Sequence, residues 1–241
     1  MTTRQNGKGR EQALNEALDS LGTSIDEVAA AINSAMPALD KTDQQIATAV
    51  HRLISRGEPV EPAAIAKAVG GVSLDRVNER LNAWPGVFRD DEGRVVGFWG
   101  QAVEKLDPEY RLLTDGTTTY AWCALDTLFI PGVIGKTVRV EASDPITAEP
   151  VSLVVDGDGV RDVTPAGAFV SMLVPEGPFA YDVIESFCHF VLFFASRASG
   201  EKWVAEHEGT TLVSVEKAFE LGRLLTERIT PAVYGAETGT R

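Results

Sequence analysis

The stretch Tyr120-Ala121-Trp122-Cys123-Ala124-Leu125-Asp126-Thr127 places a thiol and a carboxylate three residues apart in apolar surroundings. Helical residues three positions apart share a face, so a helix here would set the Cys123 sulfur beside the Asp126 carboxylate. In a strand, the same spacing would direct the two side chains to opposite faces of the sheet. Burial among apolar residues shifts the pKa values of such groups, which makes the pair a candidate active site. The alternative is a buried cysteine that acts as a small hydrophobic residue, with Asp126 on the helix surface.

The second of the two cysteines, Cys188, lies in another apolar segment, Ser186-Phe187-Cys188, which leads into Phe193-Phe194-Ala195-Ser196. Together with the stretch around Cys123, this pattern resembles the organomercurial lyases, also called alkylmercury lyases. The resemblance extends from about residue 42 to about residue 225. Its further matching positions are Pro131, Gly135 and residues 150–153, 165–167 and 213–219.

The resemblance implies an enzyme that cleaves a carbon–mercury bond by protonolysis and yields a hydrocarbon and Hg(II). Cys123 and Cys188 would hold the mercury, Asp126 would relay the proton, and all three would surround the product Hg(II). No cofactor is implied. The implied partners are the organomercurial substrate, external low-molecular-weight thiols as co-reactants, and a mercuric reductase that removes the metal.

The chain departs from the family pattern at two places. Some members carry a second cysteine directly after the catalytic one, where this chain has His189. Some carry a further cysteine in the region of residues 141–147, where this chain has none. Neither position belongs to the implied catalytic trio, so the implied chemistry is unaffected.

Ligand chemistry points to the same residues. Thiolates favour soft metals, and mercury is among the softest. Two thiolates on R–Hg⁺ would place electron density on the metal, so that the carbon could be protonated by a positioned acid. Asp126 is the ionisable neighbour by spacing, but an ordinary aspartate has a pKa of about 3.9 and is ionised at neutral pH. Burial must therefore raise its pKa, or Asp126 must receive a proton from a thiol that binds the metal.

The sequence predicts an α+β fold, with an N-terminal helical, winged-helix-like part packed on a C-terminal part that has a mixed or antiparallel sheet and flanking helices. We divide the chain into an N-terminal tail and helix (residues 1–40), a winged-helix-like subdomain (41–100) and a catalytic domain (101–241). Apolar residues at helical spacing predict a helix over residues 11–36.

Three short helices and a hairpin are predicted within the winged-helix-like subdomain. Thr42 and Gln45 form a capping-box pattern that would open the first helix. Pro62 and Ser73 would begin the next two. Apolar residues on both sides of an acidic turn then predict a hairpin over residues 87–99.

Strand patterns predominate after residue 101. An Asp115-Gly116 turn predicts a hairpin over residues 110–120, which leads into the Cys123 helix. Pro131-Gly132 is expected to end that helix. The other predicted elements are strands at 137–140, 151–155, 168–174 and 189–195, a helical turn at 181–187, and helices at 201–207 and 214–229. Residues 156–159 resemble part of a calcium loop but lack the downstream glutamate, so a turn is predicted there.

Charge and composition argue against several partners. The net charge of -13 and the pI of about 4.7 disfavour nucleic acid and anionic membranes. Residues 41–100 hold eight basic and eight acidic side chains, whereas a DNA-binding domain should present a basic face. The longest apolar run is too short for a bilayer, and the polar N-terminus is no signal peptide. Two distant cysteines form no disulfide framework, so we expect free thiols in a reducing cytoplasm.

The three histidines, His51, His189 and His207, are scattered and match no zinc spacing. His189 beside Cys188 is a candidate ligand or base, although a histidine at the edge of the core explains it as well. Three other functions stay open. A metal-sensing winged-helix repressor would need a basic face, a thiol-based metal chaperone would need both thiols but not Asp126, and a structural protein would leave both cysteines unreactive.

Overall fold

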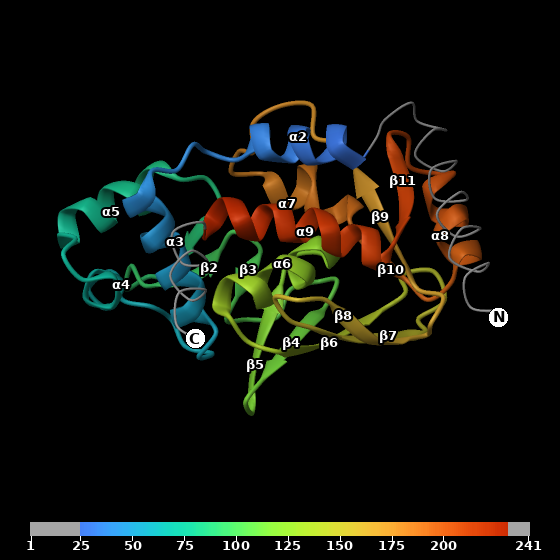
Figure 1. The fold of residues 1–241 in the computed structure, drawn as a ribbon, viewed down its shortest axis with the longest axis horizontal. Coiled ribbons are helices and arrows are strands. Elements are labelled where there is room, and N and C mark those ends of the chain that lie inside the picture. Colours follow the sequence, from blue (N-terminus) through green and yellow to red (C-terminus); the bar gives the residue numbers. More distant parts are fainter. Residues whose placement is uncertain (1–24, 231–241) are drawn as a thin grey trace, which may run out of the picture.

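Three helices and a hairpin form one end of the molecule in the computed structural model, which describes residues 25–230 (Figure 1). Their bounds are α3 (Lys41–Ile54), α4 (Pro62–Val69), α5 (Leu74–Ala83), β1 (Val87–Arg89) and β2 (Val95–Phe98). The predicted winged-helix arrangement is therefore confirmed. Pro62 stands at the first position of α4, and the Ser73 hydroxyl accepts a hydrogen bond from the backbone N–H of Arg76 at the start of α5.

The predicted capping box at Thr42 and Gln45 is wrong, because α3 begins earlier. Asp40 is the N-cap, and its carboxylate accepts the backbone N–H of Asp43 at 2.8 Å. The Asp43 carboxylate accepts the backbone N–H of Asp40 at 3.4 Å in return. Aspartate is as good an N-cap as threonine or better, so the reciprocal pair two residues upstream sets the start of the helix.

Helix α2 (Ile25–Ala35) lies across the body of the molecule and confirms part of the predicted N-terminal helix. The rest of that prediction, over residues 11–24, falls outside the described residues. Val28 and Ile32 are buried, and α2 contacts α9 (Val215–Ile229). Helix α2 therefore covers α9 on the side away from the large sheet (Figure 1).

An eight-stranded antiparallel sheet runs in the order β1-β2-β3-β5-β4-β6-β7-β8. Its other strands are β3 (Gln101–Ala102), β4 (Tyr110–Thr114), β5 (Thr117–Ala121), β6 (Val138–Ser143), β7 (Pro150–Val155) and β8 (Val160–Thr164). The predicted hairpin turn is confirmed, since Asp115 and Gly116 have φ of 48° and 82°, as a two-residue hairpin loop requires. Strands β3 and β8 were not predicted, because β3 has two residues and most side chains of β8 are exposed.

The hairpin of the winged helix belongs to this same sheet. Phe98 of β2 pairs with Gln101 of β3, and β3 pairs in turn with β5. Our division of the chain at residue 100 therefore falls between two paired strands, and we keep it as a proposal about domain organisation. Because β2 pairs with β3 and β3 pairs with β5, the end of the hairpin lies beside the start of α6 (Ala124–Ile134).

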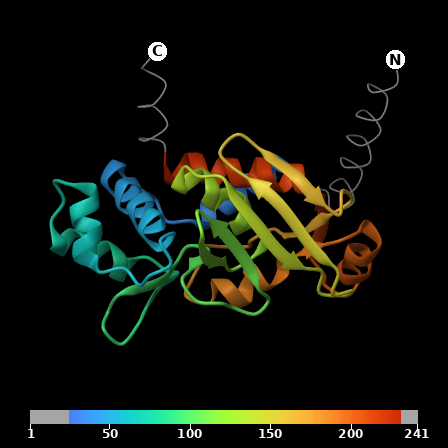
Figure 2. The ribbon, with the colours of Figure 1, turned by 90° about the horizontal axis from the view of Figure 1, so that it is seen from below.

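Helices α6 and α9 pack against each other above the large sheet, as Figure 1 and Figure 2 show from two directions. All eleven residues of α6 are buried. A Cβ atom on Gly222 would stand 3.1 Å from the backbone carbonyl carbon and oxygen of Leu128. Glycine at this position of α9 therefore permits close approach of the two helices.

Helix α6 does not end at Pro131-Gly132, so that prediction is wrong. It continues to Ile134 and ends at Gly135, which has φ of 69° and donates its N–H to the carbonyl of Pro131 at 3.0 Å. A proline inside a helix costs about 3 kcal/mol. Burial of one large apolar side chain contributes about 1.5–3 kcal/mol, and several such side chains of α6 are buried, so packing outweighs the proline.

A second, three-stranded sheet has the order β10-β9-β11. Its strands are β10 (Phe193–Phe194), β9 (Phe169–Leu173) and β11 (Thr210–Ser214), and its neighbours are α7 (Val183–Ser186), the 3-10 helix η1 (Cys188–Phe190) and α8 (Arg197–Val204). The prediction of a strand over 189–195 is mostly wrong, since only residues 193 and 194 pair with β9. The Ser171 hydroxyl accepts a hydrogen bond from the N–H of Leu192 and donates one to the carbonyl of Phe190, and the backbone N–H of Ser171 donates to the carbonyl of Leu192 at 3.0 Å.

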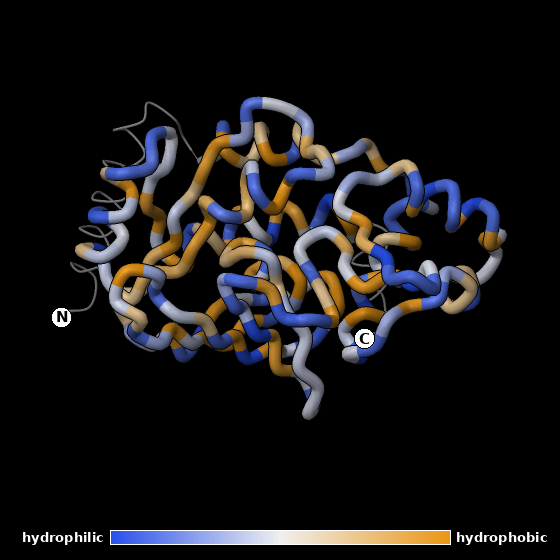
Figure 3. Tube along the Cα trace, turned by 180° about the vertical axis from the view of Figure 1, so that it is seen from behind, coloured by the Kyte–Doolittle hydropathy of each residue, from blue (hydrophilic) through white to orange (hydrophobic). Residues whose placement is uncertain are grey.

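Hydrophilic and hydrophobic residues follow one another along the Cα trace, as the hydropathy colours of Figure 3 show. Strand β6 is an example, with buried residues at alternate positions. This alternation fits a sheet with one face on the core. Within residues 25–230, no helix is long and apolar enough to cross a membrane.

Candidate active site

The junction of β5 and α6 sets Cys123 beside Asp126. Cys123 is the N-cap of α6 and has extended backbone angles (φ -151°, ψ 176°), so it is not inside the helix as the sequence suggested. Asp126 lies in the first turn, and the Cys123 sulfur and a carboxylate oxygen of Asp126 lie within 4.8 Å of each other. The pairing inferred from helical spacing is thus present, but it arises from a helix cap.

Cys188 enters the same cluster from η1. Its sulfur lies 4.0 Å from Oδ2 of Asp126, and the ligand atoms of Cys123, Asp126 and Cys188 all lie within 4.8 Å of one another. The N–H of Ala124 donates to the carbonyl of Val191 at 2.9 Å, so the segment after Cys188 is bonded to the start of α6. The structure therefore brings together all three residues selected from the sequence.

Both cysteines are free thiols, and the cluster is almost sealed from solvent. Cys123 is 0%, Cys188 3% and Asp126 8% exposed. A substrate must enter a buried, mostly apolar space to reach the sulfurs. Burial also strengthens every electrostatic interaction within the cluster.

Gly100 forms the wall behind the Asp126 carboxylate. A Cβ atom on Gly100 would stand 2.4 Å from Cγ and Oδ1 of Asp126, and the φ of Gly100 is 92°. The Gly100 carbonyl accepts the N–H of Trp122 at 2.9 Å, and Trp99 donates its indole N–H to the carbonyl of Pro85 at 2.9 Å. The end of the winged-helix hairpin is therefore part of the site.

The protonation states of the cluster follow from its burial. Burial raises the pKa of Asp126 from 3.8 to about 7, against hydrogen bonds from Cys123 and the backbone of Trp122 that lower it. Burial also raises the pKa of Cys123 well above 9.0, with further increases from Cys188 and Asp126. A hydrogen bond with Cys123 lowers the pKa of Cys188, but burial and the charges of Asp126 and Glu185 raise it, with a net upward direction. At neutral pH both thiols hold their protons, and Asp126 is protonated far more readily than an ordinary aspartate.

Tyr110 is a neighbour of the cluster that sequence reasoning missed. It is 2% exposed at the start of β4. Burial raises the pKa of its phenol well above 10.0, and the charges of Cys123, Cys188 and Asp126 raise it further. Tyr110 therefore remains a neutral hydroxyl.

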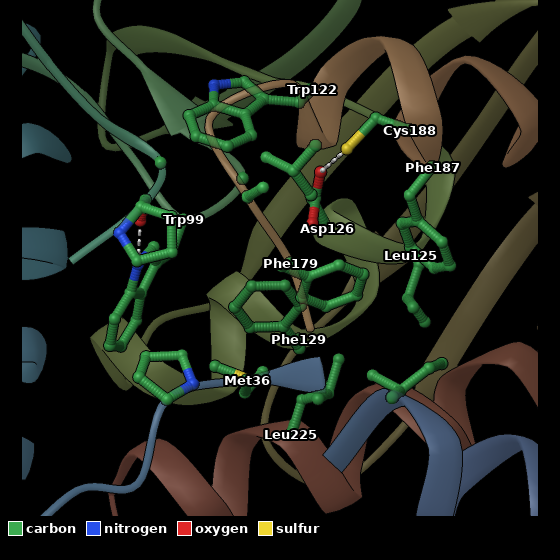
Figure 4. Close-up of a pocket in the computed structure, with 17 residues that line it drawn as sticks. Met36, Trp99, Trp122, Leu125, Asp126, Phe129, Phe179, Phe187, Cys188 and Leu225 are labelled. Atoms are coloured by element: carbon green, nitrogen blue, oxygen red, sulfur yellow. Dashed lines mark hydrogen bonds between the residues drawn. The ribbon is translucent and has the colours of Figure 1, made fainter. Parts of the chain in front are cut away.

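A cavity of about 70 Å³ opens from the cluster into apolar surroundings. Figure 4 shows Asp126 and Cys188 on one side of the lining and Met36, Phe129 and Leu225 on the other. The other lining residues are Ile32, Pro37, Pro85, Gly86, Trp99, Gly100, Trp122, Leu125, Phe179, Ala180, Val183 and Phe187. One end of the cavity thus offers sulfur and oxygen ligands, and the rest offers only contacts suited to an apolar group.

The other candidates from the sequence lie outside the cluster. His189 is exposed on η1, in agreement with an edge histidine. His51 is buried and bonded through Nδ1 to Oε1 of Gln101 at 3.0 Å, and His207 stacks on Trp203. In the turn at 156–159, the Asp156 carboxylate accepts the N–H groups of residues 158 and 159, as expected for an ordinary turn.

Met36, Phe179 and Gly100 contribute to the cavity, but sequence reasoning did not single them out. Gly100 carries a weak signal, since a glycine in a strand pattern can mark close backbone approach. Met36 and Phe179 carry none, because an isolated apolar residue near a helix end or in a loop does not reveal its partner.

Comparisons with known proteins identify the family of this chain. Residues 105–227 match the family model described as alkylmercury lyase, and residues 39–99 match the helix-turn-helix domain of alkylmercury lyase. The alkylmercury lyase of Bacillus cereus is 36% identical over 177 residues, which cover 73% of this chain and 78% of the relative. That of Pseudomonas putida is 38% identical over 178 residues, covering 74% and 81%. The crystal structure of the mercury-bound form of MerB2 shares the fold, with a TM-score of 0.69 at 20% identity, covering 85% of this chain and 100% of that chain.

Proposed function

Because the chain belongs to the alkylmercury lyase family and is an enzyme that cleaves the carbon–mercury bond of organomercurials, we propose that Cys123, Cys188 and Asp126 carry out the cleavage. The products are a hydrocarbon and Hg(II). The observation that carries the assignment is the convergence of two thiols and one carboxyl within 4.8 Å in a buried cluster. A protein that only bound mercury would need both sulfurs but no acid beside them.

The thiols capture the substrate in the first steps. One thiol of the pair loses its proton and displaces the ligand X from R–Hg–X, which releases HX. The second thiol then binds the same mercury atom as a thiolate. Thiols whose pKa is raised by burial become good ligands only when the metal takes the place of the proton.

Asp126 supplies the proton for cleavage. Its pKa of about 7 suits a group that both accepts and donates a proton at neutral pH. It takes the proton that the second thiol loses and transfers it to the carbon of the substrate. The electron pair of the carbon–mercury bond goes to carbon, R–H leaves, and Hg(II) stays on the two sulfurs. The balance is R–Hg–X plus two thiols giving R–H, HX and a dithiolate of Hg(II).

External thiols complete the cycle in this proposal. Two low-molecular-weight thiols exchange with the two cysteine sulfurs, carry Hg(II) away and restore both protein thiols. A mercuric reductase is a candidate acceptor of that mercury. We place this exchange in a reducing cytoplasm, where such thiols are available and the two cysteines stay reduced.

Two assays on three variants test the assignment: mercury stoichiometry by titration, and benzene release from phenylmercury in excess thiol. Asp126→Ala should still bind one Hg(II), because a carboxylate is a hard ligand that adds little beside two sulfurs. Its benzene release should fall by about 10² to 10⁴-fold, the usual contribution of a general acid. Cys123→Ser and Cys188→Ser should both fail to hold mercury tightly and should release no benzene.

His189→Ala is the matched control, since His189 is exposed beside Cys188 and lies outside the cluster. It should bind mercury and release benzene at the wild-type rate. Wild-type turnover in Asp126→Ala would place the acid elsewhere. Full turnover in either cysteine variant would refute the two-thiolate mechanism.

A further inference from the structure

One wall at the apolar end of the cavity, here called the roof, consists of Ile32 and Met36 from the N-terminal helix α2 and the residue after it. Ile32 lies on the buried face of α2, and Met36 follows directly after the last residue of α2. Both residues precede the segments that match the family models, which begin at residues 39 and 105. This part of the cavity is therefore built by a segment that the family match does not describe.

The backbone of the roof is fixed from two sides. The N–H of Phe179 donates to the carbonyl of Ala35 at 2.8 Å. The guanidinium of Arg228 donates to the carbonyl of Pro37 at 3.3 Å, and Gln44 donates to the carbonyl of Arg228 at 3.0 Å. The main chain on either side of Met36 is thus held in place, while its side chain remains adjustable.

The cavity is small compared with an aromatic group. A cavity of about 150 Å³ admits benzene, and this cavity measures about 70 Å³. A methyl or ethyl group fits beside mercury in such a space, whereas a phenyl group requires a wall to move. This cavity therefore distinguishes organomercurials by the size of the organic group on mercury.

Met36 is the wall that can move most easily. Methionine is unbranched and fills irregular gaps with little strain. Phe129 is a buried residue in the middle of α6, and Trp122 is a buried residue two positions before that helix. Phe179 packs against Phe187 with ring centroids 5.1 Å apart. Met36 is only partly buried and lies across the lining from Cys188 (Figure 4).

We propose that Met36 is a specificity-determining residue that limits the size of the organic group on mercury. This inference rests on the proposed function, since it concerns the group that leaves as hydrocarbon. Met36 acts by contact with that group, at the end of the cavity opposite the sulfurs. It neither binds mercury nor transfers the proton.

The test compares kcat/KM for methylmercury (methane release) and phenylmercury (benzene release) in the full chain. Met36→Ala removes three heavy atoms from the roof and should raise the phenyl-to-methyl ratio at least about tenfold, since one methylene in an apolar pocket is worth about 10 to 200-fold. Met36→Phe should lower the ratio. Met172→Ala is the matched control, because Met172 is a buried methionine of β9 that does not line this cavity.

Mercury stoichiometry from titration with HgCl₂ should remain one per chain in both Met36 variants. The inference is overturned if both Met36 variants keep the wild-type ratio within twofold, or if Met172→Ala shifts the ratio as much as Met36→Ala. A wild-type protein that releases neither methane nor benzene would instead overturn the proposed function. The two failures are therefore distinguishable.

Discussion

Replacing Gly100 with alanine should disable the acid of the cluster while leaving mercury capture intact. The added Cβ would stand 2.4 Å from Cγ and Oδ1 of Asp126, and 2.9 Å from its Cβ. Carbon atoms in contact prefer separations of about 3.5–4.0 Å, so the Asp126 carboxyl must shift by about 1 Å. Gly100 is part of the backbone that pairs with Trp122, so Asp126 is the side that yields.

The expected loss of hydrocarbon release is about 10²-fold, because a displacement of 1 Å in a catalytic group can cost that much. Two costs in stability should accompany it. Alanine at positive φ costs roughly 1–2 kcal/mol, and overpacking costs a further 1–3 kcal/mol or so. Binding of Hg(II) by Cys123 and Cys188 should stay at one per chain.

Gly116→Ala is the matched control, since Gly116 has φ of 82° and a Cβ added there would meet no atom within 4 Å. It carries the same backbone cost without any contact to the cluster. The assays are single-turnover benzene release, mercury titration and urea unfolding of both variants. The reasoning is refuted if Gly100→Ala releases benzene within twofold of Gly116→Ala.

Three further predictions concern proton binding, oxidation and helix packing. The pKa of Asp126 is about 7 in the folded protein and 3.8 in the unfolded chain, so the folded state binds this proton more tightly and its stability falls as pH rises from about 4 to 7. At about 1.36 kcal/mol per pKa unit, the free energy of unfolding of Asp126→Asn, measured in urea, should rise by on the order of 4 kcal/mol relative to that of the wild type across that range, and the difference should then level off. A difference that is independent of pH would contradict this prediction. Mild oxidant should link Cys123 to Cys188 and abolish turnover until a thiol is added, which mass spectrometry and benzene release can follow; activity that persists in oxidant would contradict the thiol mechanism. Gly222→Ala should lower the free energy of unfolding by about 1–3 kcal/mol, because its Cβ would meet the Leu128 backbone at 3.1 Å, whereas Gly159→Ala, in open space, should not.

The winged-helix hairpin has a structural role that explains its charge. Its end supplies Trp99 and Gly100 to the cavity, and β2 continues the sheet of the catalytic part. A domain that forms a wall of the site needs no basic face. The balance of basic and acidic residues over residues 41–100 is consistent with this role.

Most of the local structure could be predicted from the sequence, because it depends on residues a few positions apart. Ser73 caps α5, Asp115-Gly116 forms a hairpin turn, and apolar spacing marks the buried faces of α3 and α9. Where two local signals competed, tertiary contacts decided. Burial of α6 carried the helix through Pro131, and the segment after Cys188 forms η1 and hydrogen bonds to Ser171 in place of the predicted strand.

The sequence by itself determined which groups are the candidates for the chemistry, since two thiols and one acid in characteristic segments single out Cys123, Asp126 and Cys188. Only the tertiary structure decided how they meet. Cys188 and Asp126 are 62 positions apart and come into contact because the backbone after Cys188 is bonded to the start of α6. The approach of Gly100 and the roof at Met36 likewise depend on packing between distant elements, which no local pattern of residues encodes.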